Sequence, residues 1–296
     1  MVAPIVTSAS PSVGQGASGR NITITGSGFA NGAYTTFPAG ITSNYTQYVS
    51  PTQLIANVTV AGTTSPGNYD VTVVDPGNGV GVCSGCLTVT QGPSLTGVAP
   101  TSRGQGATAQ HIVVTGTNLA PGAAVAFSGT GITIDSTNVV SPTEVDVTID
   151  IANSAALGTR AVTVTNPDGG SATCAACFTV NKGPSVTDWN PTTSPVGFYH
   201  WDNEWRGDHW ELREMYTTGV LVTGSGFAPG ATVTYSGSAF ITVNSTTFVS
   251  SGKIKQNITV DVLDFAAHGL PTDRAITVTN PDGGAFTCQG CVVLLV

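Results

Sequence analysis

Short runs of alternating hydrophobic and polar residues occupy most of the chain. Val145, Val147 and Ile149 alternate with polar residues, and residues 161–165 alternate in the same way. A period of two predicts half-buried strands rather than helices. The runs end in clusters of Gly, Pro, Asn and Asp, which are residues that favour turns. We therefore expect an all-β chain of short strands joined by tight turns.

The strand pattern repeats three times along the chain. The sequence Asn-Pro-Asp-Gly-Gly follows a strand at residues 166–170 and again at residues 280–284, and a looser version lies at residues 75–79. Such a repeat predicts one unit of structure per copy. Seven or so short strands per unit, with turns between them, predict a β-sandwich. We expect three tandem sandwich domains, at residues 1–91, 92–182 and 183–296.

Very short linkers connect the expected domains. The first linker is Gln91-Gly92-Pro93 and the second is Lys182-Gly183-Pro184. Linkers of this length that include a proline restrict rotation between domains. The chain is therefore expected to form a semi-rigid rod.

Three motifs give the chain a resemblance to a known family. They are the Gly-Ser-Gly-Phe-Ala-Pro-Gly turn at residues 224–230, the Val-Thr-Val-Thr-Asn-Pro-Asp-Gly-Gly segment at residues 162–170 and the Phe-Thr-Val strand at residues 178–180. Together they resemble the IPT/TIG family of immunoglobulin-like domains, over all three repeats. The resemblance implies an early-set sandwich that is common in tandem arrays on bacterial surface proteins. It implies little about function, because such sandwiches serve as spacers, binders and polymer units.

Each repeat also carries one Cys-x-x-Cys pair, which is an addition to the usual family pattern. In a flat strand, residues three apart lie about 10 Å from each other, so a disulfide needs a turn or bulge between them. We favour a local disulfide that staples a bulge, because one pair per domain is an extracellular pattern. Zinc shared between domains or chains and a thioredoxin-type redox site are the alternatives. The six cysteines are Cys83, Cys86, Cys174, Cys177, Cys288 and Cys291.

The third repeat contains an insertion, near residues 198–216, that has no counterpart in the other two. It holds three of the four Trp, two of the four His and five of the seventeen acidic residues of the chain. Asp208 and Glu211 form a capping pair typical of a short helix, which would extend to Met215. Because Trp, Tyr and Arg dominate interface energies, the candidate binding or assembly residues are Tyr199, His200, Trp201, Trp205, Arg206, Trp210, Arg213 and Tyr216.

Other roles for the insertion stay open. Exposed aromatic rings beside carboxylates suit glycan binding. The metal-ligand residue types that it offers, without a strict metal spacing, are His200, Asp202, His209 and Glu211. The carboxylates that could act in glycoside hydrolysis are Asp202, Glu204, Asp208 and Glu211. The segment is so unlike its host that an engineered graft also stays open.

The low charge of the chain narrows the class of protein. Charged residues make up 9% of the sequence, against about 25% in an average soluble protein. Thr, Ser, Asn and Gly must therefore form much of the surface, as in extracellular proteins. A net charge of −8 with only nine Lys and Arg argues against a nucleic-acid partner, which requires a clustered basic face. Lys253 and Lys255 are expected to protect an exposed sheet edge.

Two further features concern membranes and export. The apolar run at residues 292–296 is too short to cross a bilayer. No signal peptide is recognisable after Met1, so we expect an export signal that was removed or that lies outside this sequence.

These patterns predict a non-enzymatic extracellular or cell-surface structural protein without a cofactor, catalytic residue or metal. We expect a repeating subunit of a surface filament, sheath or appendage that associates with itself or with another surface protein. The main alternative is a cell-surface adhesin or a glycan- or protein-binding module that uses the 198–216 insertion on an immunoglobulin-like stalk.

Overall fold

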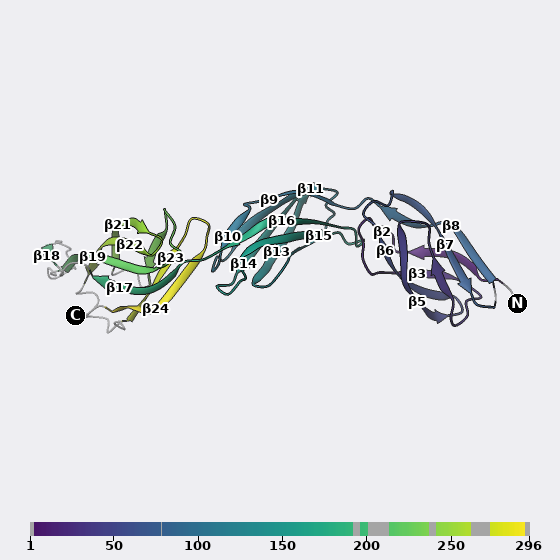
Figure 1. Cartoon of the computed structure of the whole chain (residues 1–296), viewed down its shortest axis with the longest axis horizontal. Coiled ribbons are helices and arrows are strands. Elements are labelled where there is room, and N and C mark those ends of the chain that lie inside the picture. The colour runs from purple at the N-terminus through teal and green to yellow at the C-terminus, as the bar shows by residue number, and fades with distance from the viewer. Residues whose placement is uncertain are drawn as a thin grey trace, which may run out of the picture.

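The computed structural model describes residues 3–77, 79–191, 196–200, 213–236, 241–261 and 273–293. All regular secondary structure in these residues is β-strand. The strands form three sandwiches that lie end to end in an elongated molecule, with the N-terminus at one end (Figure 1). No helix in this part of the chain is long and apolar enough to span a membrane. The predicted all-β, immunoglobulin-like fold is confirmed.

The first sandwich consists of two four-stranded sheets. One sheet has the order β1-β3-β6-β5 and the other β2-β8-β7-β4. Strand β2 runs parallel to β8, whereas the other pairs are antiparallel. The strands are β1 (Ile5–Ser10), β2 (Val13–Gly14), β3 (Arg20–Ser27), β4 (Tyr34–Thr36), β5 (Ile41–Ser50), β6 (Gln53–Val60), β7 (Gly67–Asp75) and β8 (Gly79–Thr90).

The second sandwich repeats this arrangement strand for strand. Its sheets have the orders β9-β11-β14-β13 and β10-β16-β15-β12, and β10 runs parallel to β16. The strands are β9 (Ser94–Ala99), β10 (Ser102–Gly104), β11 (Gln110–Thr117), β12 (Ala124–Phe127), β13 (Ile132–Ser141), β14 (Glu144–Ile151), β15 (Gly158–Thr165) and β16 (Ser171–Asn181).

The third sandwich departs from the pattern at one strand. Its sheets have the orders β17-β19-β22-β21 and β20-β23-β24, and β18 pairs with β19 rather than with the last strand. The strands are β17 (Ser185–Pro191), β18 (Val196–His200), β19 (Arg213–Ser225), β20 (Thr232–Tyr235), β21 (Ile241–Ser250), β22 (Lys253–Asp261), β23 (Asp273–Thr279) and β24 (Ala285–Val293).

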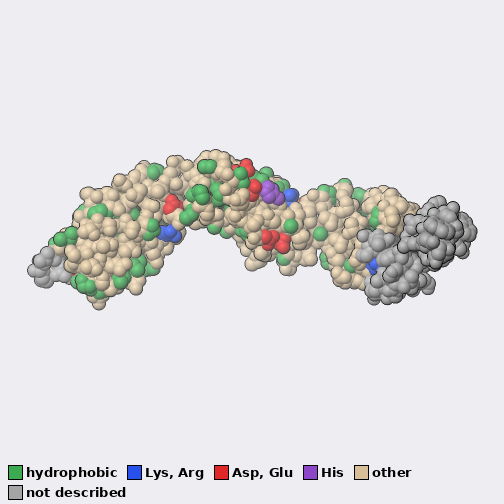
Figure 2. Space-filling model, turned by 180° about the vertical axis from the view of Figure 1, so that it is seen from behind, with side chains coloured by type: hydrophobic (Ala, Val, Ile, Leu, Met, Phe, Trp, Pro, Cys, Tyr) green, Lys and Arg blue, Asp and Glu red, His purple; other side chains and the backbone are tan. Residues whose placement is uncertain are grey.

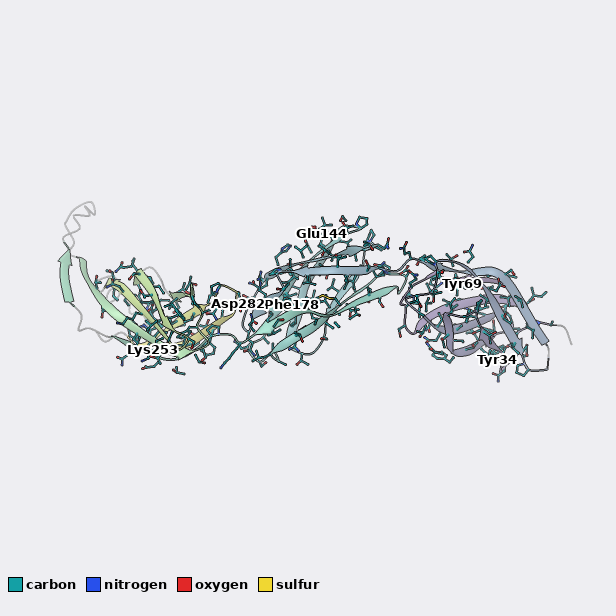
Figure 3. All side chains as sticks on the ribbon, turned by 45° about the horizontal axis from the view of Figure 1, so that its top comes forward. Tyr34, Tyr69, Glu144, Phe178, Lys253 and Asp282 are labelled. Carbon is teal, nitrogen blue, oxygen red and sulfur yellow. A yellow bond between two sulfur atoms is a disulfide. The ribbon has the colours of Figure 1, made fainter. Side chains whose placement is uncertain are left out.

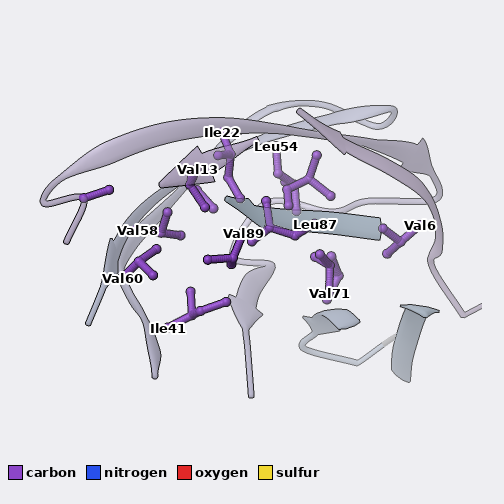
Figure 4. Packing of buried hydrophobic residues seen from close by; sticks show 14 of the residues in the cluster. Val6, Val13, Ile22, Ile41, Leu54, Val58, Val60, Val71, Leu87 and Val89 are labelled. Atoms are coloured by element: carbon purple, nitrogen blue, oxygen red, sulfur yellow. The ribbon is translucent and has the colours of Figure 1, made fainter. Parts of the chain in front are cut away.

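Each sandwich has its own hydrophobic core between its two sheets. In the first, Ile22 and Leu54 of one sheet face Val71 and Leu87 of the other (Figure 4), and all four are fully buried. Full burial of an aliphatic side chain of this size contributes about 1.5–3 kcal/mol. The alternation along β14 has the predicted effect, because its hydrophobic residues are all buried and its polar residues are partly exposed.

Lys253 and Lys255 do not lie on a sheet edge, which corrects the expectation from the sequence. Both are exposed, but their strand, β22, lies between β19 and β21. The sequence pattern showed that the two side chains share a solvent face, whereas the order of strands in the sheet is a tertiary property.

Hydroxyl and amide groups replace charges on the outer faces of the sheets. Thr163 and Thr173, on neighbouring strands, share a hydrogen bond of 2.8 Å, and Thr277 and Thr287 repeat it in the third sandwich. The face of the molecule in Figure 2 accordingly carries few charged side chains, and none is visible at its N-terminal end. Neutral cross-strand pairs of this kind stabilise a sheet without depending on ionic strength.

The two cysteines of each repeat form a disulfide across a bulge in the last strand. Their Cα atoms lie 5.6, 5.7 and 5.6 Å apart in the three sandwiches. In the first sandwich, Tyr69 pairs with Leu87 and Val71 with Cys83, so that three residues of β8 oppose Asp70 alone. The same shift occurs in β16 and β24. The bulge brings residues three apart within reach of one bridge, which a flat strand would not do.

A buried polar chain is specific to the third sandwich. The indole Nε1 of Trp189 donates to the Tyr235 hydroxyl at 3.1 Å, which donates in turn to Gln256 Oε1, and Gln256 Nε2 donates to Thr246 at 3.0 Å. Burial raises the pKa of the Tyr235 phenol to about 12, partly offset by the bond from Trp189. The neutral phenol is therefore the form that fits this core.

Removal of the bridge of the third sandwich, with Cys288→Ala and Cys291→Ala, is expected to lower its free energy of unfolding. The closed loop is short, so the chain-entropy model gives about 2 kcal/mol. All four Trp belong to the third repeat, so urea unfolding followed by Trp fluorescence reports on this sandwich. The matched control, with Cys83→Ala and Cys86→Ala, should leave the Trp transition unchanged. Free thiols in the native wild-type protein would contradict the disulfide.

The stability of the third sandwich is expected to fall as pH rises from 10 towards 12. The Tyr235 phenol ionises near pH 10 in the unfolded chain but keeps its proton to about pH 12 when folded. The unfolded state then binds fewer protons, and the loss amounts to up to about 2–3 kcal/mol. Tyr235→Phe should remove this part of the pH dependence, measured by Trp-monitored unfolding. An equal slope in both proteins would refute the assignment.

Candidate functional site

The residues predicted from the insertion are only partly described by the structure. Tyr199 and His200 end β18, and Arg213 and Tyr216 belong to β19, where His200 pairs with Arg213. The two ends of the insertion therefore form an antiparallel hairpin arm, here defined as residues 196–200 and 213–217. The predicted helix is wrong at its C-terminal end, because residues 213–215 continue the strand that pairs with β22.

Most of the remaining candidates lie outside the described residues. These are the side chains proposed for binding, Trp201, Trp205, Arg206 and Trp210, together with Asp202, Glu204, Asp208, His209 and Glu211. Within the described ranges, no group of three His, Cys, Asp or Glu side chains is placed to hold a metal ion. The roles predicted for the insertion stay predictions.

The Asn-Pro-Asp-Gly-Gly turn of the second sandwich contacts the first sandwich. Gly14 N donates to Asp168 O at 3.2 Å, and Ser171 N donates to Gln15 O at 3.1 Å. The Ser171 hydroxyl donates to Gly16 O at 2.8 Å. These bonds join the loop after β2 to the turn between β15 and β16. We call this contact the first joint.

Side chains add to the first joint. The Thr90 hydroxyl at the end of β8 donates to Asp168 Oδ2, and the Arg20 guanidinium donates to Pro167 O at 2.8 Å. The linker is held as well, because Gly92 N donates to Gln15 Oε1 at 3.0 Å. The joint therefore fixes both the docked turn and the chain that leads to it.

The second joint repeats the first between the second and third sandwiches. Gly104 N donates to Asp282 O at 3.3 Å, and Ala285 N donates to Gln105 O at 3.1 Å. Asn181, which ends β16 as Thr90 ends β8, donates to Asp282 Oδ2 at 3.1 Å. Asp282 lies where these two sandwiches meet (Figure 3). The same Gly, Gln and Asp positions thus form both joints, whereas Asn181 and Ala285 stand in for Thr90 and Ser171.

Glycine allows the backbones to meet at each joint. A Cβ on Gly14 would lie 2.5 Å from the Cα of Gly170, and a Cβ on Gly104 would lie 2.6 Å from the Cα of Gly284. Real Cβ atoms do not approach backbone atoms so closely. Any side chain at Gly14 or Gly104 would therefore push the neighbouring sandwiches apart.

The Asn and Asp of the turn have separate tasks. Asn166 faces its own sandwich, where its amide donates to Asn118 O at 2.8 Å and its Oδ1 accepts from Ala120 N at 3.0 Å. Asp168 faces the preceding sandwich, while its Oδ1 accepts from Gly170 N within the turn at 2.9 Å. The side chain of Asn166 holds the turn in place, and that of Asp168 docks it.

The end sandwiches lack one half of the joint each. In the first sandwich, Asp75 takes the place of the inward Asn and accepts from Ala30 N at 2.9 Å, but Gly77 stands where the docking Asp would be. In the third sandwich the Gly-Gln-Gly of residues 14–16 and 104–106 is replaced by the hairpin arm. The complete joint elements are therefore found at the two contacts between the three sandwiches.

Two grooves in the described surface have neutral linings. One of about 490 Å³ lies beside the second joint, between Thr108, Gln110 and Asn153 of the second sandwich and three threonines of the third. The other, of about 470 Å³, lies on the second sandwich beside Cys177. Neither lining contains an aromatic ring or a charged side chain, so neither offers the flat ring faces that suit sugars.

Sequence reasoning identified the repeated turn but not its role as a joint. A signal was present: the intact turn occurs only in repeats that follow another repeat, and Gly-Gln-Gly occurs only in repeats that precede one. Position in the array, rather than the motif alone, indicates the contact.

Comparisons with known proteins agree with the sandwich architecture. The model of the family described as IPT/TIG domain matches residues 4–90. Comparison with curated protein sequences gives no match.

Among solved structures, the chain is similar to the I9–I11 tandem from titin, with 11% identity over 98% of each chain and a TM-score of 0.30. It is also similar to InvD of Yersinia pseudotuberculosis, with 14% identity over 97% of this chain and 96% of that one and a TM-score of 0.26. The eight N-terminal Ig domains of Down Syndrome Cell Adhesion Molecule give 12% identity, over 99% of this chain and 42% of that one, and a TM-score of 0.24.

The second and third sandwiches share the strand order and the stapled bulge of the first. Residues 4–90, the first sandwich, match the model of the IPT/TIG domain family.

Proposed function

We propose that the chain is a non-enzymatic extracellular structural protein, a repeating subunit of a surface filament, sheath or appendage. In this proposal its three domains, divided after residues 91 and 182, form a semi-rigid rod. The observation that carries the proposal is the pair of equivalent joints. A chain whose repeats dock on one another through the same contacts is suited to transmit force and to hold a fixed length.

The joints favour a fixed angle between neighbouring sandwiches. The first joint contains three hydrogen bonds between Gly14–Gly16 and the segment Asp168–Ser171, and two more that Thr90 and Arg20 donate. Each such bond contributes about 0.5–1.5 kcal/mol net, and a rotation of one sandwich would break several at once. Pro93 and Pro184 in the linkers further reduce the freedom of the chain.

The composition supports an extracellular location. One disulfide in each sandwich suits an oxidising compartment. A neutral, hydroxyl-rich surface suits close side-by-side packing of subunits, because it avoids charge repulsion. The proposed partners are accordingly other copies of the chain or another surface protein.

A cell-surface adhesin is the second candidate, and the hairpin arm favours it. Strand β18 lies at the opposite end of the molecule from the N-terminus (Figure 1). An arm at the end of a rod is well placed to present the aromatic residues of the insertion to a glycan or protein. In that case the sandwiches would serve as a stalk.

Gly14→Ala together with Gly104→Ala is expected to loosen the rod without unfolding it. Neither glycine has a positive φ, so the added methyl group acts through its clash across the joint rather than through its own backbone. Small-angle X-ray scattering of the full chain should show a broader distribution of maximum dimensions, whereas circular dichroism should not change.

Gly62→Ala is the matched control, because a Cβ there meets nothing within 4 Å and Gly62 also lacks a positive φ. It should scatter like the wild type. If the double joint variant does so too, the joints do not set the angle between the sandwiches.

Replacement of residues 201–212 by a short glycine turn separates the two candidate functions. For the filament subunit we expect assembly to be lost, as seen by negative-stain microscopy, while the disulfide-bonded sandwiches stay folded. Assembly that persists with loss of glycan or protein binding would instead support the adhesin. Assembly and binding that both persist would contradict a role for the insertion in either.

A further inference from the structure

The outer face of one sheet of the first sandwich is apolar near the N-terminal end. Tyr34 of β4 pairs with Val74 of β7, which pairs with Val80 of β8. In the next row Val82 of β8 pairs with Thr72 of β7. Residues between these on the same strands, such as Val73 and Thr35, point into the core and are buried. We call Tyr34, Val74, Val80 and Val82 the pole patch.

The same positions hold only Ala, Ser and Thr in the other two sandwiches. The register places Ala124, Thr165, Ser171 and Thr173 there in the second sandwich. In the third it places Thr232, Thr279, Ala285 and Thr287 there. The position of Val80 is therefore that of Ser171 and Ala285, whose backbone N–H groups form the two joints. The pole patch continues a surface that the chain already uses twice as an interface.

The substitution of residue types changes what this surface can bind. The docking Asp is replaced by Gly77 and the joint Ser or Ala by the larger Val80, so the carboxylate that accepts from Thr90 or Asn181 and the small side chain at the joint are both absent. In their place, Tyr34 is 48% exposed, Val80 54% and Val82 56%. Exposed apolar side chains grouped on one face mark an interaction surface. The partner that fits is apolar rather than a polar loop.

Charge favours a second copy of this end of the molecule. The first repeat contains only three charged side chains, Arg20, Asp70 and Asp75. Arg20 lies in the first joint, and Asp75 is 2% exposed and accepts from Ala30 N. Asp70 is exposed on β7 and accepts from Gly85 N of the bulge at 2.8 Å. Two copies that meet at the pole patch therefore experience little of the repulsion that a net charge of −8 would produce elsewhere.

We propose that the pole patch binds the pole patch of a second copy of this chain, so that two rods join at their N-terminal ends about a two-fold axis. Such an interface is isologous, because the same apolar surface of each copy forms both sides of the contact. Tyr34 and the three valines form its apolar centre, and Thr36 and Thr72, next to them on the same face, form part of a polar rim. This proposal is independent of the filament or adhesin role, because either kind of rod could pair in this way.

The second sandwich supplies the residues for the test. A variant with Tyr34→Ala, Val74→Thr, Val80→Ser and Val82→Thr gives the face the residues that the same fold carries at the equivalent positions, so it should fold. Sedimentation velocity of the full chain over a range of concentrations should show a monomer–dimer equilibrium for the wild type. The variant should weaken this association by at least about tenfold.

Val140→Thr with Val249→Thr is the matched control, because these valines are 52% and 51% exposed but lie on β13 and β21 of the other sandwiches. This control should associate like the wild type. A wild type that stays monomeric at its highest soluble concentration would overturn the proposal, as would a pole-patch variant that associates normally.

Cross-linking tests the geometry and does not depend on assembly through other surfaces. No described cysteine is free, so Val80→Cys adds a thiol that a short bismaleimide should link into covalent dimers. Val140→Cys should give far fewer. Equal cross-linking at the two positions would overturn the two-fold contact. If the Val80→Cys protein forms covalent dimers but negative-stain microscopy shows no filaments, the result would count against the filament role alone.

Discussion

The backbone contact between Gly14 and Gly170, repeated between Gly104 and Gly284, determines how the sandwiches are arranged. A side chain at Gly14 or Gly104 would hold the turn away from the N–H and C=O groups with which it forms hydrogen bonds. The hydrogen bonds of each joint are short-range, so they form only when the backbones are this close. The end-to-end order of the three cores therefore depends on the absence of two Cβ atoms.

A second constraint acts within each sandwich. In the last strand of each sandwich, a disulfide-bridged bulge places three residues opposite one residue of the neighbouring strand. Beyond the bulge, the strand continues to the end of the sandwich, where Thr90 and Asn181 reach the docking Asp of the next repeat. The disulfide thus fixes the strand that supplies a side chain to the joint. Fold stability and the orientation of the next sandwich are linked through one strand.

The two ends of the rod differ from the joints in opposite ways. At the N-terminal end Gly77 replaces the docking Asp and Val80 replaces the joint Ser or Ala. At the other end the hairpin arm occupies the place of the Gly-Gln-Gly loop. The first sandwich lacks the docking Asp, and the third lacks the Gly-Gln-Gly loop. The contacts between sandwiches repeat, whereas the first and third sandwiches each have features that the others lack.

The sequence by itself determined the local features. Period-two alternation gave the strands because each strand buries one face, as Val145, Val147 and Ile149 show. The Asn-Pro-Asp-Gly-Gly turn and the repeat of the cysteines were visible because they depend on neighbours along the chain. The tertiary structure alone decided that Lys253 lies on an inner strand, that Arg213 belongs to a strand rather than a helix, and that Asp168 docks on another sandwich. These depend on which segments, distant in sequence, meet in space, and local patterning does not encode that directly.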